Sequence, residues 1–255
     1  MIKAEYHDFA IELAHASGAF IRPYFCNPEL VVELKSDLTI VTAADRGAEK
    51  IMRKMIAQRY PEHGVVGEEL GVENADAEYV WMLDPIDGTV SFAAGVPLFG
   101  TLIALCHRGQ PILGVIHLPI SGELMIGDGS LTTLNGSAVH SRKVTALEDA
   151  LLLCTDIKNV ELHQNAAAFH TLVHRTKTPR GWGDCYGYLL LATGRADIMC
   201  DPVLKPWDIA ALIPVIQGAG GVITSWQGKA PLNANSIVAA ATPELHASVI
   251  EALNP

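Results

Sequence analysis

The feature that most constrains the fold of this chain is a short apolar segment that ends in two aspartates. The segment VWML occupies residues 80–83, and DPIDGT follows it at residues 84–89. A β-strand over the apolar residues would deliver Asp84 to the edge of a sheet, where Pro85 fixes φ and Gly88 permits a tight turn. Asp84 and Asp87 are then expected to face one point.

Two carboxylates at one point require a cation. They repel each other, and one of them takes up a proton unless a positive charge intervenes. Oxygen ligands without histidine or cysteine select Mg²⁺ rather than zinc. The alternative interpretation is an Asp-rich turn that uses glycine only for its geometry.

Two further acidic segments lie at the ends of predicted elements. Glu68 and Glu69 follow an apolar pair and a glycine, and Asp208 follows Trp207 at the start of a predicted helix. Taken singly, a glutamate pair is typical of a solvated loop, and an aspartate at a helix start is favoured by the helix dipole. The order and spacing of all three segments together indicate one metal site.

Composition and charge exclude several classes of function. The 255 residues are 49% hydrophobic, which is enough for a large core in one big domain or two small ones. The net charge of −10 predicts no binding to nucleic acid, and an anionic substrate would need local cations. Five scattered cysteines without a C-x-x-C pair indicate neither a zinc site nor a disulfide framework. Without a long apolar run or a secretory signal, we expect a cytoplasmic protein that binds no membrane.

Hydrophobic periodicity predicts helices and strands along the chain. Helices are expected at residues 5–25, 43–60, 165–174, 184–193, 207–217 and 243–253, and strands at residues 80–83, 101–106, 112–118, 123–126, 150–154, 196–200 and 237–241. Residues 108–111 are expected to form a hairpin connection between the strands at 101–106 and 112–118. Thr42 and Asp45 have the spacing of a helix capping box. Pro214 is expected to kink its helix, unless the helix has other boundaries. A change of pattern predicts two halves: residues 1–145, an α+β half with most metal ligands, and residues 146–255, an α/β half with Asp208.

Four motifs together resemble the inositol monophosphatase superfamily of Mg²⁺-dependent, lithium-sensitive phosphatases. They are KSD with VTAAD at residues 35–37 and 41–45, GEE at residues 67–69, WMLDPIDGT at residues 81–89, and WDIAA with AGG at residues 207–211 and 219–221. The motifs extend almost from end to end of the chain. The resemblance implies an α/β fold, a layered α/β/α/β/α sandwich, in a protein that is usually a homodimer.

The resemblance also implies roles for individual residues. Two or three Mg²⁺ ions per site would be held by Glu68, Asp84, Asp87, Asp208 and the carbonyl of Ile86. The implied catalytic residues are Glu68, Thr89, Asp45 and Glu69, of which Thr89 and Asp45 would lie beside the attacking water. Backbone N–H groups of Gly88 and Thr89 would hold the phosphate of a small phosphomonoester, which a metal-activated water attacks.

The C-terminal half carries the residues expected to select the substrate. RGWGDCY at residues 180–186 resembles the histidinol-phosphate phosphatase branch of the superfamily. Asp184 and Asp201 are expected to bind the ammonium and imidazole of histidinol phosphate by charge-assisted hydrogen bonds. Arg180 is expected to orient Asp184 or to contact phosphate. The alternatives are a surface ion pair between Arg180 and Asp184, and a turn role for Asp201 before Pro202.

The sequence therefore predicts hydrolysis of L-histidinol phosphate to L-histidinol and phosphate. Within the same class, an inositol monophosphatase or a broad sugar-phosphate phosphatase is the alternative. A regulatory binding protein on the same fold is the alternative of another class, because a fold does not fix a function.

Overall fold

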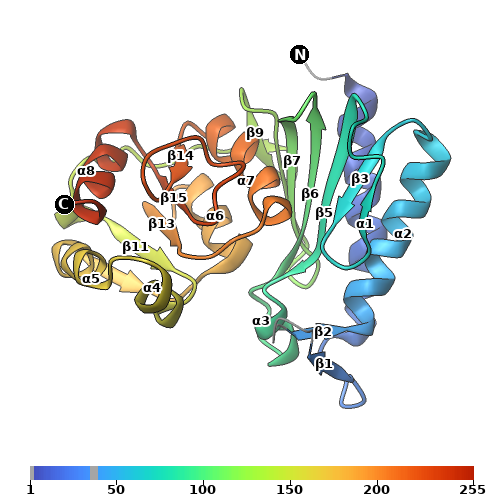
Figure 1. Ribbon diagram of the computed structural model, residues 1–255, viewed down its shortest axis with the longest axis horizontal. Helices are drawn as coiled ribbons and strands as arrows, with labels where there is room; N and C mark the ends of the chain where they lie inside the picture. The colour runs from blue at the N-terminus through green and yellow to red at the C-terminus, as the bar shows by residue number, and fades with distance from the viewer. Residues whose placement is uncertain (1–2, 35–39) are drawn as a thin grey trace.

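A large mixed sheet runs through the molecule in the structure, a computed structural model that describes residues 3–34 and 40–255 (Figure 1). Its eight strands have the order β10-β9-β8-β7-β6-β5-β3-β4. They are β3 (Gly64–Gly67), β4 (Gly71–Glu73), β5 (Tyr79–Asp87), β6 (Gly100–His107), β7 (Gln110–Leu118), β8 (Glu123–Gly127), β9 (Thr132–Leu134) and β10 (Ser137–Ala138). β3 and β5 run parallel, and the other pairs are antiparallel. The predicted motif at residues 35–37 lies outside the described residues.

The central strands of this sheet are buried on both faces. In β6, every residue from Gly100 to Cys106 is buried, so the strand shows an almost continuous apolar run instead of alternation. Arg108 and Gly109 connect β6 to β7 with φ values of 50° and 75°. Two consecutive residues with positive φ form the turn that suits a two-residue hairpin, and the predicted hairpin is confirmed.

Two long helices cover one face of the large sheet. α1 (Ala4–Ile21) packs on β6 and β7, and α2 (Ala43–Arg59) packs on β5. The chain beyond α1 tightens into a 3₁₀ turn, η1 (Arg22–Tyr24), so the α-helix is shorter than predicted. The backbone N–H of Thr42 donates to Asp45 at 2.8 Å, and the Thr42 hydroxyl accepts from Ala44 at 3.1 Å. The predicted start of α2 is confirmed.

Two central helices separate the large sheet from a smaller one. α6 (Asp184–Ala192) packs on β6 and on β13 (Ile198–Asp201), and α7 (Pro206–Gly218) packs on β5, β6 and β7. α7 continues across Pro214, whose carbonyl accepts from the Gly129 N–H at 3.0 Å. Packing on both sides supports the helix where proline removes a backbone hydrogen bond.

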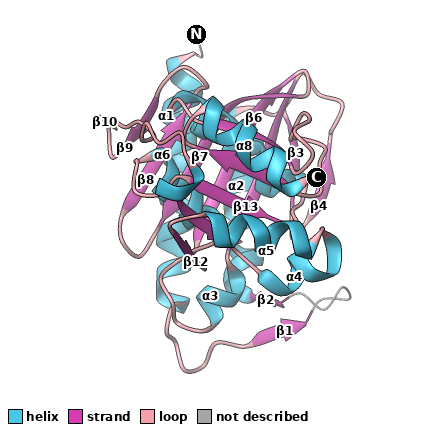
Figure 2. Cartoon of the chain, turned by 90° about the vertical axis from the view of Figure 1, so that its left-hand side faces the viewer, coloured by secondary structure: helices cyan, strands magenta, loops and turns pink. Residues whose placement is uncertain are grey.

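The smaller sheet has five strands in the order β12-β11-β13-β15-β14. The strands besides β13 are β11 (Leu151–Cys154), β12 (Thr178–Arg180), β14 (Val222–Ser225) and β15 (Ile237–Ala240). Three helices form the outer layer, and Figure 2 looks onto them in front of β13: α4 (Ile157–His163), α5 (Ala166–Arg175) and α8 (Pro243–Leu253). The predicted α/β/α/β/α order of layers is confirmed (Figure 1).

One hydrophobic core joins the two sheets. It includes Leu102 and Ile116 from the large sheet and Met199 and Ala239 from the small one, with α6 and α7 between them. The connection between the sheets contains residue 145, where the sequence predicts a boundary. Because the core is shared, the division into two halves stays a prediction.

The longest apolar helices of the described residues fall short of what a membrane crossing requires.

Several short elements were not predicted from the sequence. They include β1 (Val32–Leu34), β2 (Ile40–Thr42), β3, β4, α3 (Thr89–Ala93), α4 and β12. β5 is longer than predicted because it continues through Pro85, with a shift of register between Asp84 and Asp87. A bulge of this kind is one of the few places where a strand accepts proline, and here it lies between the two aspartates, which pair with Leu102 and Gly100.

Candidate metal and phosphate site

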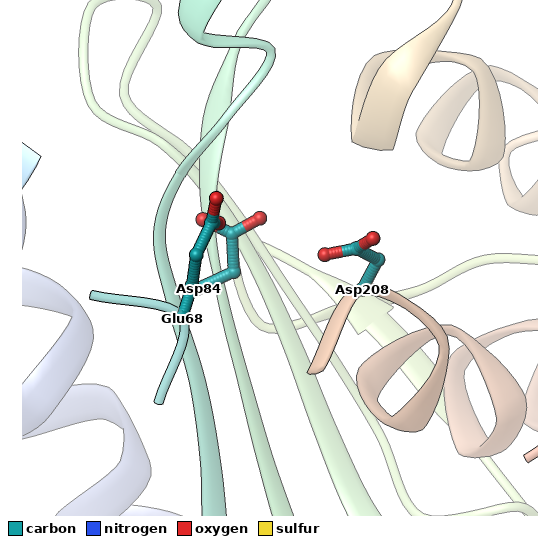
Figure 3. Close-up of side chains that lie close together, drawn as sticks. All are labelled: Glu68, Asp84 and Asp208. Atoms are coloured by element: carbon teal, nitrogen blue, oxygen red, sulfur yellow. The ribbon is translucent and has the colours of Figure 1, made fainter. Parts of the chain in front are cut away.

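Three carboxylates from distant parts of the chain meet between the large sheet and α7. Glu68 follows β3, Asp84 lies in β5, and Asp208 lies in the first turn of α7. Each offers an oxygen that lies within 4.8 Å of an oxygen from each of the others. Figure 3 shows Glu68 and Asp84 side by side, with the carboxylate of Asp208 directed toward them. The structure therefore brings together three of the four carboxylates predicted from the sequence, without Asp87, and their role as metal ligands stays a prediction.

The parallel pairing of β3 and β5 places Glu68 beside Asp84. Gly67 is in register with Leu83, and the backbone N–H of Glu68 donates to the Leu83 carbonyl at 3.1 Å. Parallel strands end at the same edge of a sheet, so the residues that follow both of them share one site. This register explains why Glu68 and Asp84, which belong to separate motifs, lie at the same site.

The turn after Asp84 is fixed by hydrogen bonds to its own backbone. The Asp84 carboxylate accepts from the Ile86 N–H at 3.0 Å, and the Thr89 hydroxyl donates to the Ile86 carbonyl at 3.0 Å. Gly88 has φ of 89°, a conformation that favours glycine, and α3 begins at the next residue. The N–H groups of Gly88 and Thr89 thus lie at the start of a helix that has no preceding turn to accept them.

A second contact supports the turn after Asp84, from the side of β6 and α1. The hydroxyl of Thr101 donates to the Pro85 carbonyl at 2.8 Å and lies 2.9 Å from the hydroxyl of Ser17. Both hydroxyl-bearing side chains are fully buried. The turn is therefore tied to α1 through β6.

Asp87 connects the turn to the other half of the chain. Its carboxylate accepts from the backbone N–H of Cys185, in the first turn of α6. This hydrogen bond favours the charged form, but burial and the charge of Asp184, also in the first turn of α6, raise the pKa of Asp87 well above its ordinary value. Asp208 is held in a similar way, because its carboxylate accepts from the Lys205 N–H at 2.7 Å.

The two other predicted catalytic residues lie on the α2 side of the site. Asp45 is 1% exposed, and its carboxylate accepts from the backbone and the hydroxyl of Thr42. Burial raises its pKa, with a smaller contribution from the charge of Glu68. The Glu69 backbone N–H donates at 2.8 Å to Glu49, a buried residue that the sequence analysis did not single out. The roles of Asp45 and Glu69 in catalysis stay predictions.

The electrostatics of the site fit a divalent cation. Burial raises the pKa of Asp84 well above its ordinary value, and the charges of Glu68, Asp87 and Asp208 raise it further. Burial also raises the pKa of Asp208 to about 7. Nearby carboxylates that resist ionisation are stabilised by a bound cation, and an all-oxygen donor set suits Mg²⁺. The donor chemistry of these residues therefore fits the metal implied by the sequence.

A cavity of about 150 Å³ adjoins the carboxylates on the side of the small sheet. Asp87 and Asp208 line it together with Asp156, Asp184 and Asp201. A larger cleft of about 890 Å³ shares several of these residues and also includes Glu68, Asp84, Gly88 and Thr89. The cleft therefore joins the carboxylate site to an acidic pocket.

The acidic pocket contains one buried aspartate, Asp201, and two half-buried ones, Asp156 and Asp184. Asp201 is 2% exposed and accepts from the Tyr188 hydroxyl at 2.7 Å. Burial raises its pKa to about 6, although the hydrogen bonds from Tyr188 and Thr155 lower it. Burial raises the pKa of Asp184 to about 7, and the charges of Asp201 and Asp156 add to the shift. The structure thus places both predicted substrate residues in one pocket.

Arg180 lies apart from these residues. It ends the edge strand β12, it is exposed, and its guanidinium donates to the Pro179 carbonyl at 2.7 Å. Gly181 and Gly183 line the larger cleft, but Arg180 does not. Among the described residues Arg180 and Asp184 form no ion pair, because the strand end points the arginine toward solvent.

Sequence reasoning missed four residues that shape the site. Thr155, Asp156 and Tyr188 line the pocket, and Glu49 supports the segment that carries Glu68 and Glu69. An aspartate before a short helix is a signal for Asp156, whose carboxylate caps α4. Arg53, four residues after Glu49 on α2, is a signal for a paired, buried glutamate.

Comparison with known proteins agrees with this geometry. Residues 3–255 match the model of the inositol monophosphatase family. The chain is 42% identical over 253 residues to the bifunctional phosphatase IMPL2 of Arabidopsis thaliana, covering 94% of this chain and 72% of that protein. It is 38% identical over 221 residues to the histidinol-phosphatase of Chlorobaculum parvum, covering 86% and 85% of the two chains. The solved structure of an inositol monophosphatase from Zymomonas mobilis superimposes with a TM-score of 0.87 at 36% identity, with both chains fully covered.

Proposed function

The chain belongs to the inositol monophosphatase family, a family of metal-dependent phosphatases, and on that premise we propose that it hydrolyses L-histidinol phosphate to L-histidinol and phosphate. The observation that carries the proposal is an acidic pocket directly beside the three converging carboxylates. The similarity to a histidinol-phosphatase, at 38% identity, supports the same substrate.

We propose two or three Mg²⁺ ions as the cofactor. Glu68, Asp84, Asp87, Asp208 and the carbonyl of Ile86 would hold them. When bound, Mg²⁺ supplies Lewis-acid activation of water and neutralises charge on the phosphate and on the leaving oxygen. The raised pKa values of Asp84 and Asp208 support a cation at this place.

The chain's own residues position the phosphate and the attacking water. The Thr89 hydroxyl donates its hydrogen bond to the Ile86 carbonyl. Its oxygen can therefore accept a hydrogen bond from the attacking water. Glu68 accepts a hydrogen bond from the same water, and Asp45 is the further carboxylate beside that water. The N–H groups of Gly88 and Thr89 hold phosphate oxygens, which leaves the alcohol to project toward the acidic pocket.

The acidic pocket favours a cationic alcohol over a neutral one. Burial and the charge of Asp201 raise the pKa of Asp184, and a positively charged group beside the two carboxylates removes that cost. Histidinol carries an ammonium and an imidazole, and both can donate charge-assisted hydrogen bonds to carboxylates. A polyol such as inositol also hydrogen-bonds to aspartate, but it leaves the negative charge uncompensated.

A substrate panel tests the proposal. The purified chain is assayed with Mg²⁺ against L-histidinol phosphate, inositol 1-phosphate and p-nitrophenyl phosphate, and kcat/KM is compared. We expect a preference of at least about 100-fold for histidinol phosphate over inositol 1-phosphate, because compensation of two buried charges is worth a few kcal/mol. Equal values, or a preference for inositol 1-phosphate, would overturn the choice of substrate and leave the phosphatase assignment intact.

A further inference from the structure

A buried carboxylate lies directly behind the segment that carries Glu68. It belongs to Glu49, which follows Asp45 by one turn of α2, and its side chain has 0% exposure. One of its oxygens accepts from the Glu69 N–H at 2.8 Å, and the other accepts from the Leu70 N–H at 3.1 Å. The carboxylate therefore holds two consecutive backbone groups immediately after Glu68.

The segment is also packed tightly against this carboxylate. A Cβ atom at Gly67 would lie 2.0 Å from an oxygen of Glu49, closer than any side chain tolerates. On the opposite side, the Glu68 N–H is bound to the Leu83 carbonyl of β5. The backbone of Glu68 is thus fixed from α2 on one side and from the sheet on the other.

Arg53 completes the arrangement. Its Nε donates to Glu49 at 2.8 Å, and a second nitrogen donates to the Gly71 carbonyl at the start of β4. The arginine side chain is 12% exposed, and it also lies 3.7 Å from the exposed carboxylate of Glu73. A buried carboxylate is costly unless it is paired and fully hydrogen-bonded, and Glu49 meets both conditions.

We propose that Glu49 is a positioning residue for the metal site. Its carboxylate fixes the backbone from Gly67 to Leu70, so that the Glu68 side chain is directed at Asp84 and Asp208. The inference rests on the proposed function, which assigns Mg²⁺ to Glu68. Residues that orient metal ligands from behind contribute about 10- to 100-fold to metal affinity or activity.

If Glu49 positions Glu68, its substitution should weaken Mg²⁺ binding specifically, which a purely structural role would not predict. In Glu49→Gln, an NH₂ group replaces one side-chain oxygen, and this group cannot accept the hydrogen bonds that the oxygen receives from the backbone or from Arg53. Glu68 then loses its fixed direction, and Mg²⁺ binding weakens about 10- to 100-fold. Saturating Mg²⁺ restores most of kcat, and KM for the phosphoester at that Mg²⁺ concentration stays within about twofold of the wild type, because the substrate groups are untouched.

The test is calorimetric titration of Mg²⁺ into metal-stripped protein without substrate. Glu73→Gln is the matched control, since it removes an exposed partner of the same arginine without touching the loop. The proposal is supported if Glu49→Gln weakens Mg²⁺ binding at least about tenfold while Glu73→Gln binds as the wild type does. Binding by Glu49→Gln within twofold of the wild type overturns it. A wild-type chain that binds no Mg²⁺ would instead refute the proposed function.

A second variant decides the matter if Glu49→Gln does not fold. Arg53→Lys keeps the positive charge but removes the Nε donor that orients the Glu49 carboxylate. We expect a weaker effect in the same direction, about three- to tenfold on Mg²⁺ binding, with circular dichroism unchanged. Unchanged Mg²⁺ binding in this folded variant would overturn the proposal.

Discussion

The cleft has a metal side, with Asp84, Asp87 and Asp208, and an alcohol side, with Asp184 and Asp201. Each side contains a buried aspartate, but the carboxylates are held in different ways. On the metal side, Asp84, Asp87 and Asp208 each accept a hydrogen bond from a backbone N–H. On the alcohol side, Asp201 is held by side-chain hydroxyls, among them Tyr188. The same kind of carboxylate is thus fixed by the fold in one region and by replaceable side chains in the other.

This difference has a functional meaning. Backbone hydrogen bonds survive most substitutions, so the metal side is determined by the path of the main chain. Side-chain hydrogen bonds change with a single residue, so the alcohol side can be altered without disturbing the fold. One scaffold can therefore keep its phosphate chemistry while its choice of alcohol changes.

The largest expected effect is the loss of activity in Asp84→Asn. The substitution removes a central ligand, and we expect kcat/KM to fall at least about 10³-fold, because metal activation contributes several kcal/mol. The same change removes a buried charge that Glu68, Asp87 and Asp208 oppose. The metal-free variant should therefore melt at the same temperature as the wild type or higher, measured by calorimetry in EDTA.

The opposite result for Asp84→Asn would contradict the assignment of Asp84 to the metal side. A variant that keeps its activity, or that loses stability only in the metal-free state, would mean that Asp84 serves the fold rather than the metal. Asp76→Asn, at an exposed position, is the control and should change neither property.

The next effect concerns the dependence of stability on pH on the alcohol side. The pKa of Asp201 is about 6 in the folded chain, above its ordinary value of 3.8. Well below its ordinary pKa of 3.8, the residue is protonated in both states. Between pH 4 and 6 the folded state retains a proton that the unfolded state has released, so the free energy of unfolding falls as pH rises, by about 3 kcal/mol.

Urea unfolding of metal-free protein at several pH values measures this effect. Asp201→Asn cannot titrate, so its free energy of unfolding should fall less than that of the wild type between pH 4 and 6. Parallel curves for the two proteins would show that Asp201 is not strained in the folded chain.

A smaller effect on activity is expected for Asp184→Asn. This variant distinguishes binding of the alcohol from phosphate chemistry at the metal side. Asp184 has φ of 51°, a conformation that asparagine tolerates, so the backbone is preserved. Loss of one charge-assisted hydrogen bond should lower kcat/KM for histidinol phosphate about 10- to 100-fold. Hydrolysis of p-nitrophenyl phosphate should change less than about threefold, because that substrate has no cationic group to lose a partner. Equal losses on both substrates would place Asp184 on the metal side instead.

The smallest effect is expected for Thr101→Val. This change leaves the Pro85 carbonyl and the Ser17 hydroxyl buried without their partner. We expect a loss of about 1–2 kcal/mol in the free energy of unfolding and a fall in kcat of less than about tenfold. A fall in kcat of more than about tenfold would mean that side chains, and not only the backbone, fix the turn at residues 84–89.

The metal side was largely predictable from the sequence. Its residues stand in contiguous motifs at element ends, and the resemblance of these motifs to a known family implied that Glu68, Asp84 and Asp208 converge. The capping box at Thr42 and the hairpin at residues 108–109 were predictable because their signals are local. The order of layers came from the resemblance of these motifs to a known family.

The alcohol side was predictable only in part. Asp184 and Asp201 were identified, but Asp156 was not, because three separate elements assemble the pocket. Arg180 was expected near Asp184, yet a neighbour in sequence at the end of an edge strand can point to solvent. The support of Glu49 for the Glu68 segment depends on a contact across twenty residues, which periodicity does not reveal.

The central claim is that these carboxylates converge in order to bind a divalent cation. Anomalous diffraction from crystals soaked in Mn²⁺, a scatterer that replaces Mg²⁺, tests it most directly. The account predicts a strong peak bounded by Glu68, Asp84 and Asp208. A map in which those three side chains surround no Mn²⁺ peak, or in which they lie apart, would contradict it.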